Sequence, residues 1–99
     1  MFFIKVMSSY RDVVAICDSD LIGKKFESGK FQLDVKESFY KGEEVDEEEL
    51  NRIIKKMSAE DATFNIVGEK SINVALKTGI VVEEGIREIQ GVPFALVLL

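Results

Sequence analysis

The segment Gly68-Glu69-Lys70-Ser71 has the residue types of an anion-binding helix start. A glycine followed by free backbone amides at a helix N-terminus can bind an anion, with Lys70 and Ser71 as further donors. A phosphate loop, however, needs an earlier glycine that is missing here, and Glu69 stands between Gly68 and Lys70. The segment therefore predicts ordinary helix capping, with an anion site at Gly68, Lys70 and Ser71 as the alternative, and it argues against ATP hydrolysis.

Residues 43–49 hold six carboxylates in seven positions. Such a run is typical of a solvated first helical turn, where acidic side chains stabilise the helix dipole. Two alternatives are a divalent cation, although no calcium-loop spacing is present, and docking of a basic protein partner. For docking, the candidate residues are Glu47, Glu48 and Glu49.

Two adjacent aromatic residues, Phe39 and Tyr40, precede Lys41. In an extended chain they point to opposite faces, so burial of Phe39 would turn Tyr40 outward beside Lys36 and Lys41. An exposed tyrosine flanked by lysine is typical of an anchor for a protein partner or a stacked base. The favoured interpretation is nevertheless that Tyr40 covers the entry to the next helix. In the alternative, Phe39, Tyr40 and Lys41 are the partner-binding candidates.

Composition excludes much other chemistry. The 99 residues contain no His, no Trp and a single Cys, Cys17. Without imidazole there is no Ser-His-Asp or Cys-His relay, and zinc, haem and iron–sulfur sites lack their ligands. At the end of an apolar strand, Cys17 is expected to be a buried structural thiol. We therefore expect no catalytic residues, no cofactor and no metal.

Length and charge indicate one domain, residues 1–99, in a cytoplasmic protein without a membrane span. The longest apolar stretch, Val92–Leu99, is far shorter than the roughly 20 residues that a bilayer requires, and the N-terminal residues do not resemble a signal peptide. The net charge of −5 argues against broad nucleic-acid binding. Residues 21–42 nevertheless hold five lysines against three acids, so RNA binding through the Lys24–Lys41 region is a further alternative.

The elements that must position these residues follow from local patterns. Residues 2–7 and 12–17 are rich in β-formers and predict an N-terminal hairpin. Phe31, Leu33 and Val35 alternate with polar residues, which predicts a strand with these three on its buried face. The short apolar run Ala62–Val67 fits either a strand or a helix start, and we interpret it as a strand.

Two helices and a closing hairpin complete the prediction. Asp46 with Glu49 has capping-box spacing, and the apolar positions that follow form one stripe: Leu50, Ile53, Ile54 and Met57. A second helix is expected over residues 69–78, ended by Gly79. Residues 86–89 and 92–98 predict a hairpin around Gln90-Gly91 whose last strand is buried. Asp18-Ser19-Asp20 is expected to cap a short turn that ends at Gly23. The predicted fold is α+β, a mixed or antiparallel sheet of five or six strands with two helices packed on it.

With these segments interpreted, the chain resembles the archaeal domain-of-unknown-function family 424 over nearly its whole length. Four segments carry the resemblance: Cys17-Asp18 with Leu21-Ile22-Gly23-Lys24, Glu37-Ser38-Phe39-Tyr40 with Gly42-Glu43, Asn65–Lys70, and Gly91-Val92-Pro93. After the proline the resemblance implies His then Ala, whereas this chain has Phe94-Ala95. The resemblance implies an archaeal, cytoplasmic protein. It connects the protein with translation through the neighbours of such genes, and it supplies no assigned activity.

Together these patterns favour a non-catalytic interaction module, associated with the translation machinery, whose partner is a basic protein or a ribonucleoprotein. The alternatives are a small-ligand or anion-binding domain, or a small enzyme, that uses the helix start at Gly68, and a protein that binds RNA directly. If the four resembling segments converge on one surface, we expect that surface to be a binding site.

Overall fold

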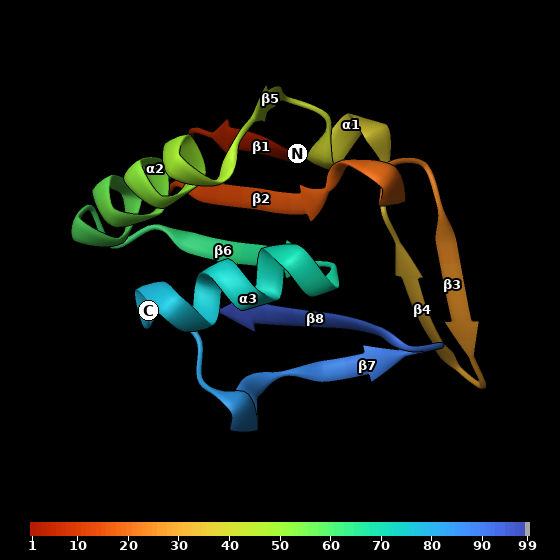
Figure 1. The fold of residues 1–99 in the computed structure, drawn as a ribbon. Coiled ribbons are helices and arrows are strands. Elements are labelled where there is room, and N and C mark those ends of the chain that lie inside the picture. Colours follow the sequence, from red (N-terminus) through yellow and green to blue (C-terminus); the bar gives the residue numbers. More distant parts are fainter. Residues whose placement is uncertain (99) are drawn as a thin grey trace.

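The computed structural model describes residues 1–98, whose strands form a six-stranded sheet and a two-stranded sheet (Figure 1). The large sheet consists of β1 (Phe2–Met7), β2 (Val13–Asp18), β5 (Glu43–Val45), β6 (Thr63–Val67), β7 (Arg87–Ile89) and β8 (Val92–Val97). The order across it is β5-β1-β2-β6-β8-β7, with β2 and β6 parallel and the other neighbours antiparallel. The small sheet is a hairpin of β3 (Lys25–Ser28) and β4 (Phe31–Asp34).

Two helices, α2 (Glu47–Ala59) and α3 (Glu69–Thr78), pack on one face of the large sheet (Figure 1). The remaining helical segments are short: α1 (Glu37–Tyr40) and the 3₁₀ turns η1 (Ser19–Leu21) and η2 (Glu83–Gly85). The α+β class, the mixed sheet of six strands and the two covering helices are therefore confirmed. Among residues 1–98, no helix combines the length and apolarity needed to cross a membrane.

Helix α2 begins where its sequence predicts. The Asp46 carboxylate accepts a hydrogen bond from the Glu49 amide at 2.9 Å, which satisfies one of the unpaired donors of the first turn. Leu50, Ile54 and Met57 from the apolar stripe are buried against the sheet, and Ile53 is half-buried at its edge. The hydrophobic stripe thus fixes which side of α2 faces β1 and β2.

The second face of the sheet is covered only at one end. There α1 and the β3–β4 hairpin pack against a small cluster that includes Cys17, Val35 and Tyr40. The strand predicted at residues 31–35 exists but belongs to the separate hairpin, and Phe31 is 73% exposed, so its predicted burial is wrong. Phe31 lies at the tip of the hairpin, beyond the reach of the cluster, whereas Leu33 and Val35 lie at its base and are buried.

The C-terminal hairpin forms around Gln90 and Gly91 as predicted, but β8 is not a buried strand. Only Ala95 of its residues is buried, and Leu96 is 57% exposed. The cause is that neither α1 nor the β3–β4 hairpin reaches over this part of the second face. The prediction of a buried last strand, which was based on its apolar composition, is therefore wrong.

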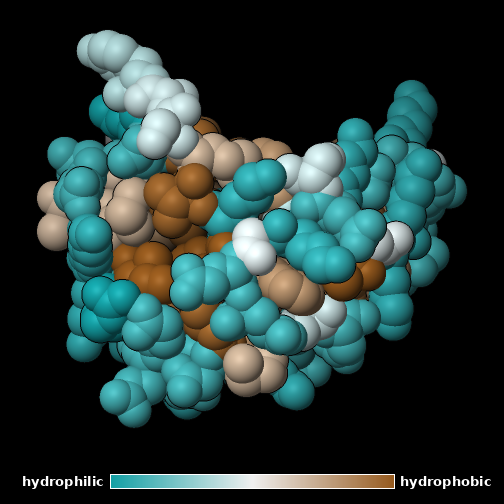
Figure 2. All heavy atoms as spheres, turned by 90° about the horizontal axis from the view of Figure 1, so that it is seen from above, coloured by the Kyte–Doolittle hydropathy of each residue, from teal (hydrophilic) through white to brown (hydrophobic). Residues whose placement is uncertain are grey.

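The opposite edge of the sheet is also only partly covered. Strand β5 pairs with Phe2–Ile4 and leaves the second half of β1 without a neighbour on that side, where Val6 is 46% exposed. Seen from above, hydrophilic side chains cover most of the surface, and hydrophobic ones show between them on the left, over the side of α2 and the end of β1 (Figure 2).

Candidate functional site

The parallel strands β2 and β6 end side by side, since Cys17 pairs with Val67. In open sheets the crevice outside the carboxyl ends of parallel strands is a recurrent ligand site. The start of β8 reaches the same place, because the Gly68 amide donates to the Pro93 carbonyl at 2.8 Å. Three chain segments that are distant in sequence therefore meet at one end of the sheet.

Asp18, the last residue of β2, caps helix α3 from the neighbouring strand. Its carboxylate accepts hydrogen bonds from the Lys70 amide at 3.1 Å, the Ser71 amide at 2.8 Å and the Ser71 hydroxyl at 2.7 Å. Asp18 is 6% exposed and Ser71 is fully buried. The N-terminus of α3, where the helix dipole favours negative charge, is thus occupied by a carboxylate of the protein itself.

Gly68, the N-cap of α3, has the backbone geometry that makes this contact possible. Its φ of 112° and ψ of 151° lie in a region that is essentially restricted to glycine. A Cβ on Gly68 would lie 2.6 Å from Oδ1 and 2.7 Å from Oδ2 of Asp18. The absence of a side chain at position 68 is what allows the Asp18 carboxylate to reach the helix.

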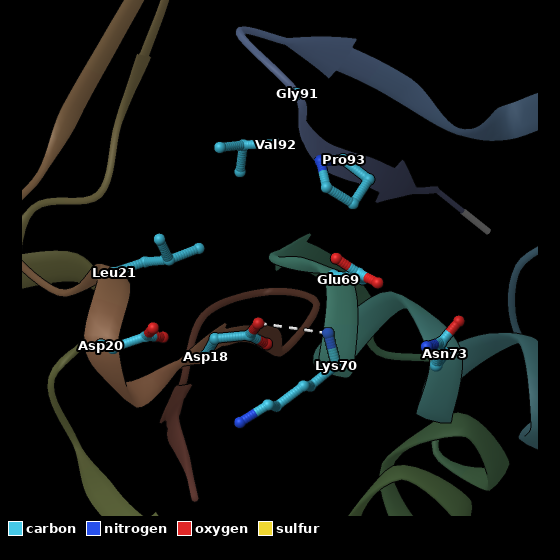
Figure 3. Close-up of a pocket in the computed structure, with 9 residues that line it drawn as sticks. All are labelled: Asp18, Asp20, Leu21, Glu69, Lys70, Asn73, Gly91, Val92 and Pro93. Atoms are coloured by element: carbon cyan, nitrogen blue, oxygen red, sulfur yellow. Dashed lines mark hydrogen bonds between the residues drawn. The ribbon is translucent and has the colours of Figure 1, made fainter.

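Beside this cap lies a cavity of about 350 Å³, which we call the Asp18 cavity. Its lining residues come from the end of β2, η1, α3, the β7–β8 turn and the start of β8: Asp18, Asp20, Leu21, Glu69, Lys70, Asn73, Gly91, Val92 and Pro93. In the close-up, Leu21 and Asp20 lie on one side, Val92 and Pro93 on a second, and Glu69 and Asn73 on a third (Figure 3). Three of the four segments that carry the family resemblance therefore converge on one site.

The cavity combines an acidic rim with an apolar wall. Asp20 and Glu69 are exposed, while Leu21, Val92 and Pro93 are half-buried. Three carboxylates and one ammonium line it, and the Lys70 side chain extends away from Val92 and Pro93 (Figure 3). An environment of this kind suits a cationic group attached to an aliphatic stem, such as a lysine or arginine side chain.

Neither the Ser71 hydroxyl nor the Cys17 thiol beside the cavity is an accessible nucleophile. The Ser71 hydroxyl donates to Asp18, but it is fully buried and cannot meet a substrate. Cys17 is also fully buried; burial and the adjacent Asp18 carboxylate raise the pKa of its thiol to about 12. The thiol is therefore protonated at neutral pH and behaves as a small hydrophobe. Within residues 1–98, no group of three or more His, Cys, Asp or Glu side chains is placed to hold a metal ion.

The same burial predicts a stability loss at alkaline pH. Burial, with a contribution from Cys17, raises the pKa of Tyr40 to about 12 as well. Both groups ionise at lower pH in the unfolded chain, so above about pH 9 that chain binds fewer protons and the free energy of unfolding falls. Each group contributes a decrease of up to about 1.4 kcal/mol per pH unit until its folded-state pKa is reached.

Urea denaturation at two pH values measures this loss of unfolding free energy. At about pH 8 neither group contributes to the loss, whereas at about pH 11 both do. Tyr40→Phe should remove the tyrosine share of the pH dependence, whereas Tyr10→Phe, at a fully exposed position, should leave the dependence unchanged. An equal pH dependence in the wild-type protein and in Tyr40→Phe would contradict the prediction.

The aromatic candidates lie in a helical turn and not in an extended chain. Tyr40 is buried and Phe39 is half-buried, so the alternative in which Tyr40 points outward as an anchor is wrong. Their rings meet edge to face with centroids 5.0 Å apart, and both belong to the cluster on the second face of the sheet. The helical turn of α1 directs both rings toward the sheet, and Lys41, which is exposed, pairs with Glu37 at 3.3 Å.

The acidic run at residues 43–49 divides between β5 and α2, and the three candidates Glu47, Glu48 and Glu49 all lie in the first turn of α2. Glu47 forms an ion pair with Lys77 of α3 at 3.6 Å, and Glu49 forms one with Arg52 one turn along α2. The Arg52 hydrogen bond holds the pKa of Glu49 below its ordinary value. Two of the three predicted partner-binding carboxylates thus have partners within the chain.

The anion-binding candidates are at the centre of the site but in another role. The amides of Lys70 and Ser71 and the Ser71 hydroxyl all donate to Asp18. An external anion at this helix start would have to displace Asp18. Ordinary capping, the first interpretation of Gly68–Ser71, matches the structure, but the capping carboxylate comes from β2.

Sequence patterns assigned Asp18 to the wrong partner. It was expected to cap the short turn that follows it, yet η1 has no side-chain cap hydrogen bond. The capped helix lies more than 50 residues further along the chain. The available signal was the family resemblance, which includes Asp18, Glu69 and Lys70 but does not indicate that they meet.

The chain is similar to proteins whose function has not been assigned. A family described as "Protein of unknown function (DUF424)" matches residues 7–99. The fold is similar to the crystal structure of an uncharacterized conserved protein from Methanopyrus kandleri, with a TM-score of 0.85 and 25% sequence identity. The likeness covers 98% of this chain and 91% of the other. No curated protein matches the sequence.

Proposed function

The chain belongs to the DUF424 family of proteins of unknown function, and we propose that it is a non-catalytic interaction module whose Asp18 cavity binds a basic segment of a partner protein. The observation that carries the proposal is the convergence of the η1, α3 and β7–β8 segments around one acidic cavity. A lysine or arginine side chain would lay its aliphatic stem on Val92 and Pro93 and direct its charge toward Asp20 and Glu69.

Asp20 and Glu69 are the residues that we expect to contact the partner's charge. Both are exposed and line the cavity, whereas the carboxylate of Asp18 is already satisfied by the helix. Exposed charges at the rim of a site act mainly on association rate and on partner selection. Asp18 therefore shapes the cavity, and Asp20 with Glu69 selects for positive charge.

The acidic run at residues 43–49 is a weaker candidate for the same role. Glu47 and Glu49 form ion pairs with Lys77 and Arg52, which an incoming cation would have to replace. Among residues 1–98, Asp20 at the rim of the Asp18 cavity forms no ion pair that an incoming cation would have to replace. Basic proteins of the translation machinery, the class that the family resemblance implies, have the charge that this site requires.

Reversing the rim charge should abolish most of this binding. In the double variant Asp20→Lys, Glu69→Lys, we expect the affinity for a fluorescent Lys/Arg-rich peptide to fall by about tenfold or more at low salt, because attraction becomes repulsion. Fluorescence anisotropy titration measures the dissociation constant. Increasing the salt concentration should weaken wild-type binding, since exposed charges are screened.

The matched control is Glu83→Lys, Glu84→Lys, which makes the same change in net charge at exposed positions of η2. This control should bind the peptide like the wild type. Equal losses in the two double variants would show that only overall charge matters, and an unchanged affinity in the rim variant would refute the proposed site. A pull-down from the native host with and without RNase, using the wild-type and rim-variant chains, then identifies the natural partner.

A further inference from the structure

A second hollow lies on the other side of the β7–β8 hairpin, between it and the β3–β4 hairpin. Its volume is about 570 Å³ and its lining residues are Ser28, Phe31, Arg87, Glu88, Ile89 and Phe94; we call it the hairpin groove. The Gln90 side chain donates to the Glu27 carbonyl at 2.8 Å and holds the two hairpins together. Figure 1 shows the tip of the β3–β4 hairpin beside the β7–β8 turn. The groove shares no lining residue with the Asp18 cavity.

Strand alternation places an aromatic ring on each wall of the hairpin groove. Phe26 packs toward the sheet, and Ser28, two residues further, lies on the same side of β3 and pairs with Phe31. On the opposite wall Arg87 and Phe94 are register partners in β7 and β8, so their side chains are neighbours. Phe31 therefore faces an arginine–phenylalanine pair across the groove.

The exposure of Phe31 calls for a reason. It is 73% exposed at the lip of a groove, where an aromatic ring loses the hydrophobic stabilisation that burial would provide. Arg87 on the facing wall is exposed as well. In proteins that bind single-stranded nucleic acid, aromatic side chains stack on the bases and guanidinium groups bind the phosphates. The open groove presents both kinds of group.

Cations stand beside the aromatic rings, although the two walls of the groove are balanced in charge. The β3–β4 hairpin holds two lysines against two acids, and β7 holds Arg87 beside Glu88. Lys30 lies in the hairpin turn directly before Phe31, and Arg87 lines the groove. The acid Glu27 on the hairpin accepts from Gln32 at 3.0 Å. An anionic occupant would therefore be contacted by Lys30 and Arg87 individually.

We propose that the hairpin groove binds single-stranded RNA, with one unpaired base stacked between Phe31 and Phe94 and with Arg87 and Lys30 contacting the adjacent phosphates. A stacked base fits both aromatic walls, because every base has a π-face. An apolar side chain of a protein partner would use the rings but not the flanking cations. The groove binds independently of the Asp18 cavity, so this inference does not rest on the function proposed above.

Removing the Phe31 ring tests the proposal. For a short fluorescent single-stranded RNA at about 50 mM salt, we expect Phe31→Ala to weaken binding by about 5- to 150-fold, the usual effect of losing one stacking ring. Because Phe31 is exposed, the variant should melt at the wild-type temperature. The matched control is Val82→Ala, which truncates a residue that is 61% exposed at the start of η2 and should leave binding unchanged.

Three further readouts separate stacking from simple charge attraction. An RNA with 2-aminopurine in place of one base should change its fluorescence on binding to the wild type and not on binding to Phe31→Ala. Duplex RNA, whose bases are already stacked, should bind more weakly than the single strand. The variant Asp20→Lys, Glu69→Lys should retain single-strand binding. No RNA binding, equal binding of duplex and single strand, or a Phe31→Ala variant that binds like the wild type would each overturn the proposal.

Discussion

Replacing Gly68 with alanine is expected to lower the free energy of unfolding by about 4 kcal/mol, a large fraction of the roughly 5–15 kcal/mol that stabilises a domain. Two effects combine. The φ of 112° is strained for any residue with a Cβ, and that Cβ would lie 2.6 Å from Oδ1 of Asp18. Either the carboxylate or the helix start must move, and both are buried. Chemical denaturation measures the loss.

The matched control is Gly79→Ala at the other end of α3. Gly79 has a φ of 83°, but a Cβ there would meet no atom within 4 Å. Only the left-handed backbone conformation is then penalised, at a cost of about 1–2 kcal/mol. If the two alanine variants lose the same stability, the contact with Asp18 does not explain the glycine at position 68.

Elements with strong local signals were predicted correctly. Helix α2 carries its cap, its acidic first turn and its apolar stripe within 13 residues, and α3 ends at Gly79 in the predicted left-handed conformation. The β7–β8 turn likewise forms at Gln90 and Gly91. In each case the interacting residues lie within a few positions of one another, so a local sequence pattern is enough to predict the element.

Short elements and their side-chain directions were not predictable in the same way. Strands β3 and β5 and helix α1 have three or four residues each, too few for a periodic pattern. Tyr40 shows the consequence, because an extended chain would turn it away from Phe39 whereas a helical turn lets both rings face the sheet. The positions of these elements depend on tertiary contacts: α1 packs on β1 and β2, β5 pairs with β1, and β3 contacts β4 and β7.

The candidate site depends on contacts between distant segments. Asp18 meets Ser71 across 53 residues, and Gly68 meets Pro93 across the β6–β8 pair. No local pattern indicates such contacts, and the capping oxygens of Asp18 fit the turn beside it equally well on sequence grounds. The family resemblance identified the segments that converge, but only the parallel pairing of β2 with β6 brings them together.

Both proposed binding sites use the β7–β8 hairpin. Val92 and Pro93 line the Asp18 cavity, while Arg87 and Phe94 line the hairpin groove. A partner that combines a basic protein segment with exposed single-stranded RNA would therefore contact two adjacent surfaces. Linked sites of this kind gain affinity through effective concentration without any new contact. The Asp18 cavity is proposed to bind a cationic segment and the hairpin groove an anionic one. The variant Asp20→Lys, Glu69→Lys should therefore affect only peptide binding, and Phe31→Ala only RNA binding.

Replacing Asp18 with alanine is expected to lower the free energy of unfolding by about 3 kcal/mol, because three donors lose one charged acceptor. Ser71 is fully buried, so neither its amide nor its hydroxyl can turn to water instead.

Chemical denaturation of the single and double variants separates the contributions. Ser71→Ala removes one donor and leaves both amide bonds, so it should cost about 1 kcal/mol. In the Asp18→Ala, Ser71→Ala double variant the loss should be smaller than the sum, since no hydroxyl is left unpaired. The same logic couples Asp18 to Gly68. Once the carboxylate is absent, Gly68→Ala keeps only its backbone strain, so it should cost less than it does in the wild type. It should still cost more than Gly79→Ala, because the φ and ψ of Gly68 lie outside the left-handed region. Additive losses in both cycles would mean that Asp18 does not hold the end of β2 on the start of α3, and the Asp18 cavity would lose the contact that shapes it.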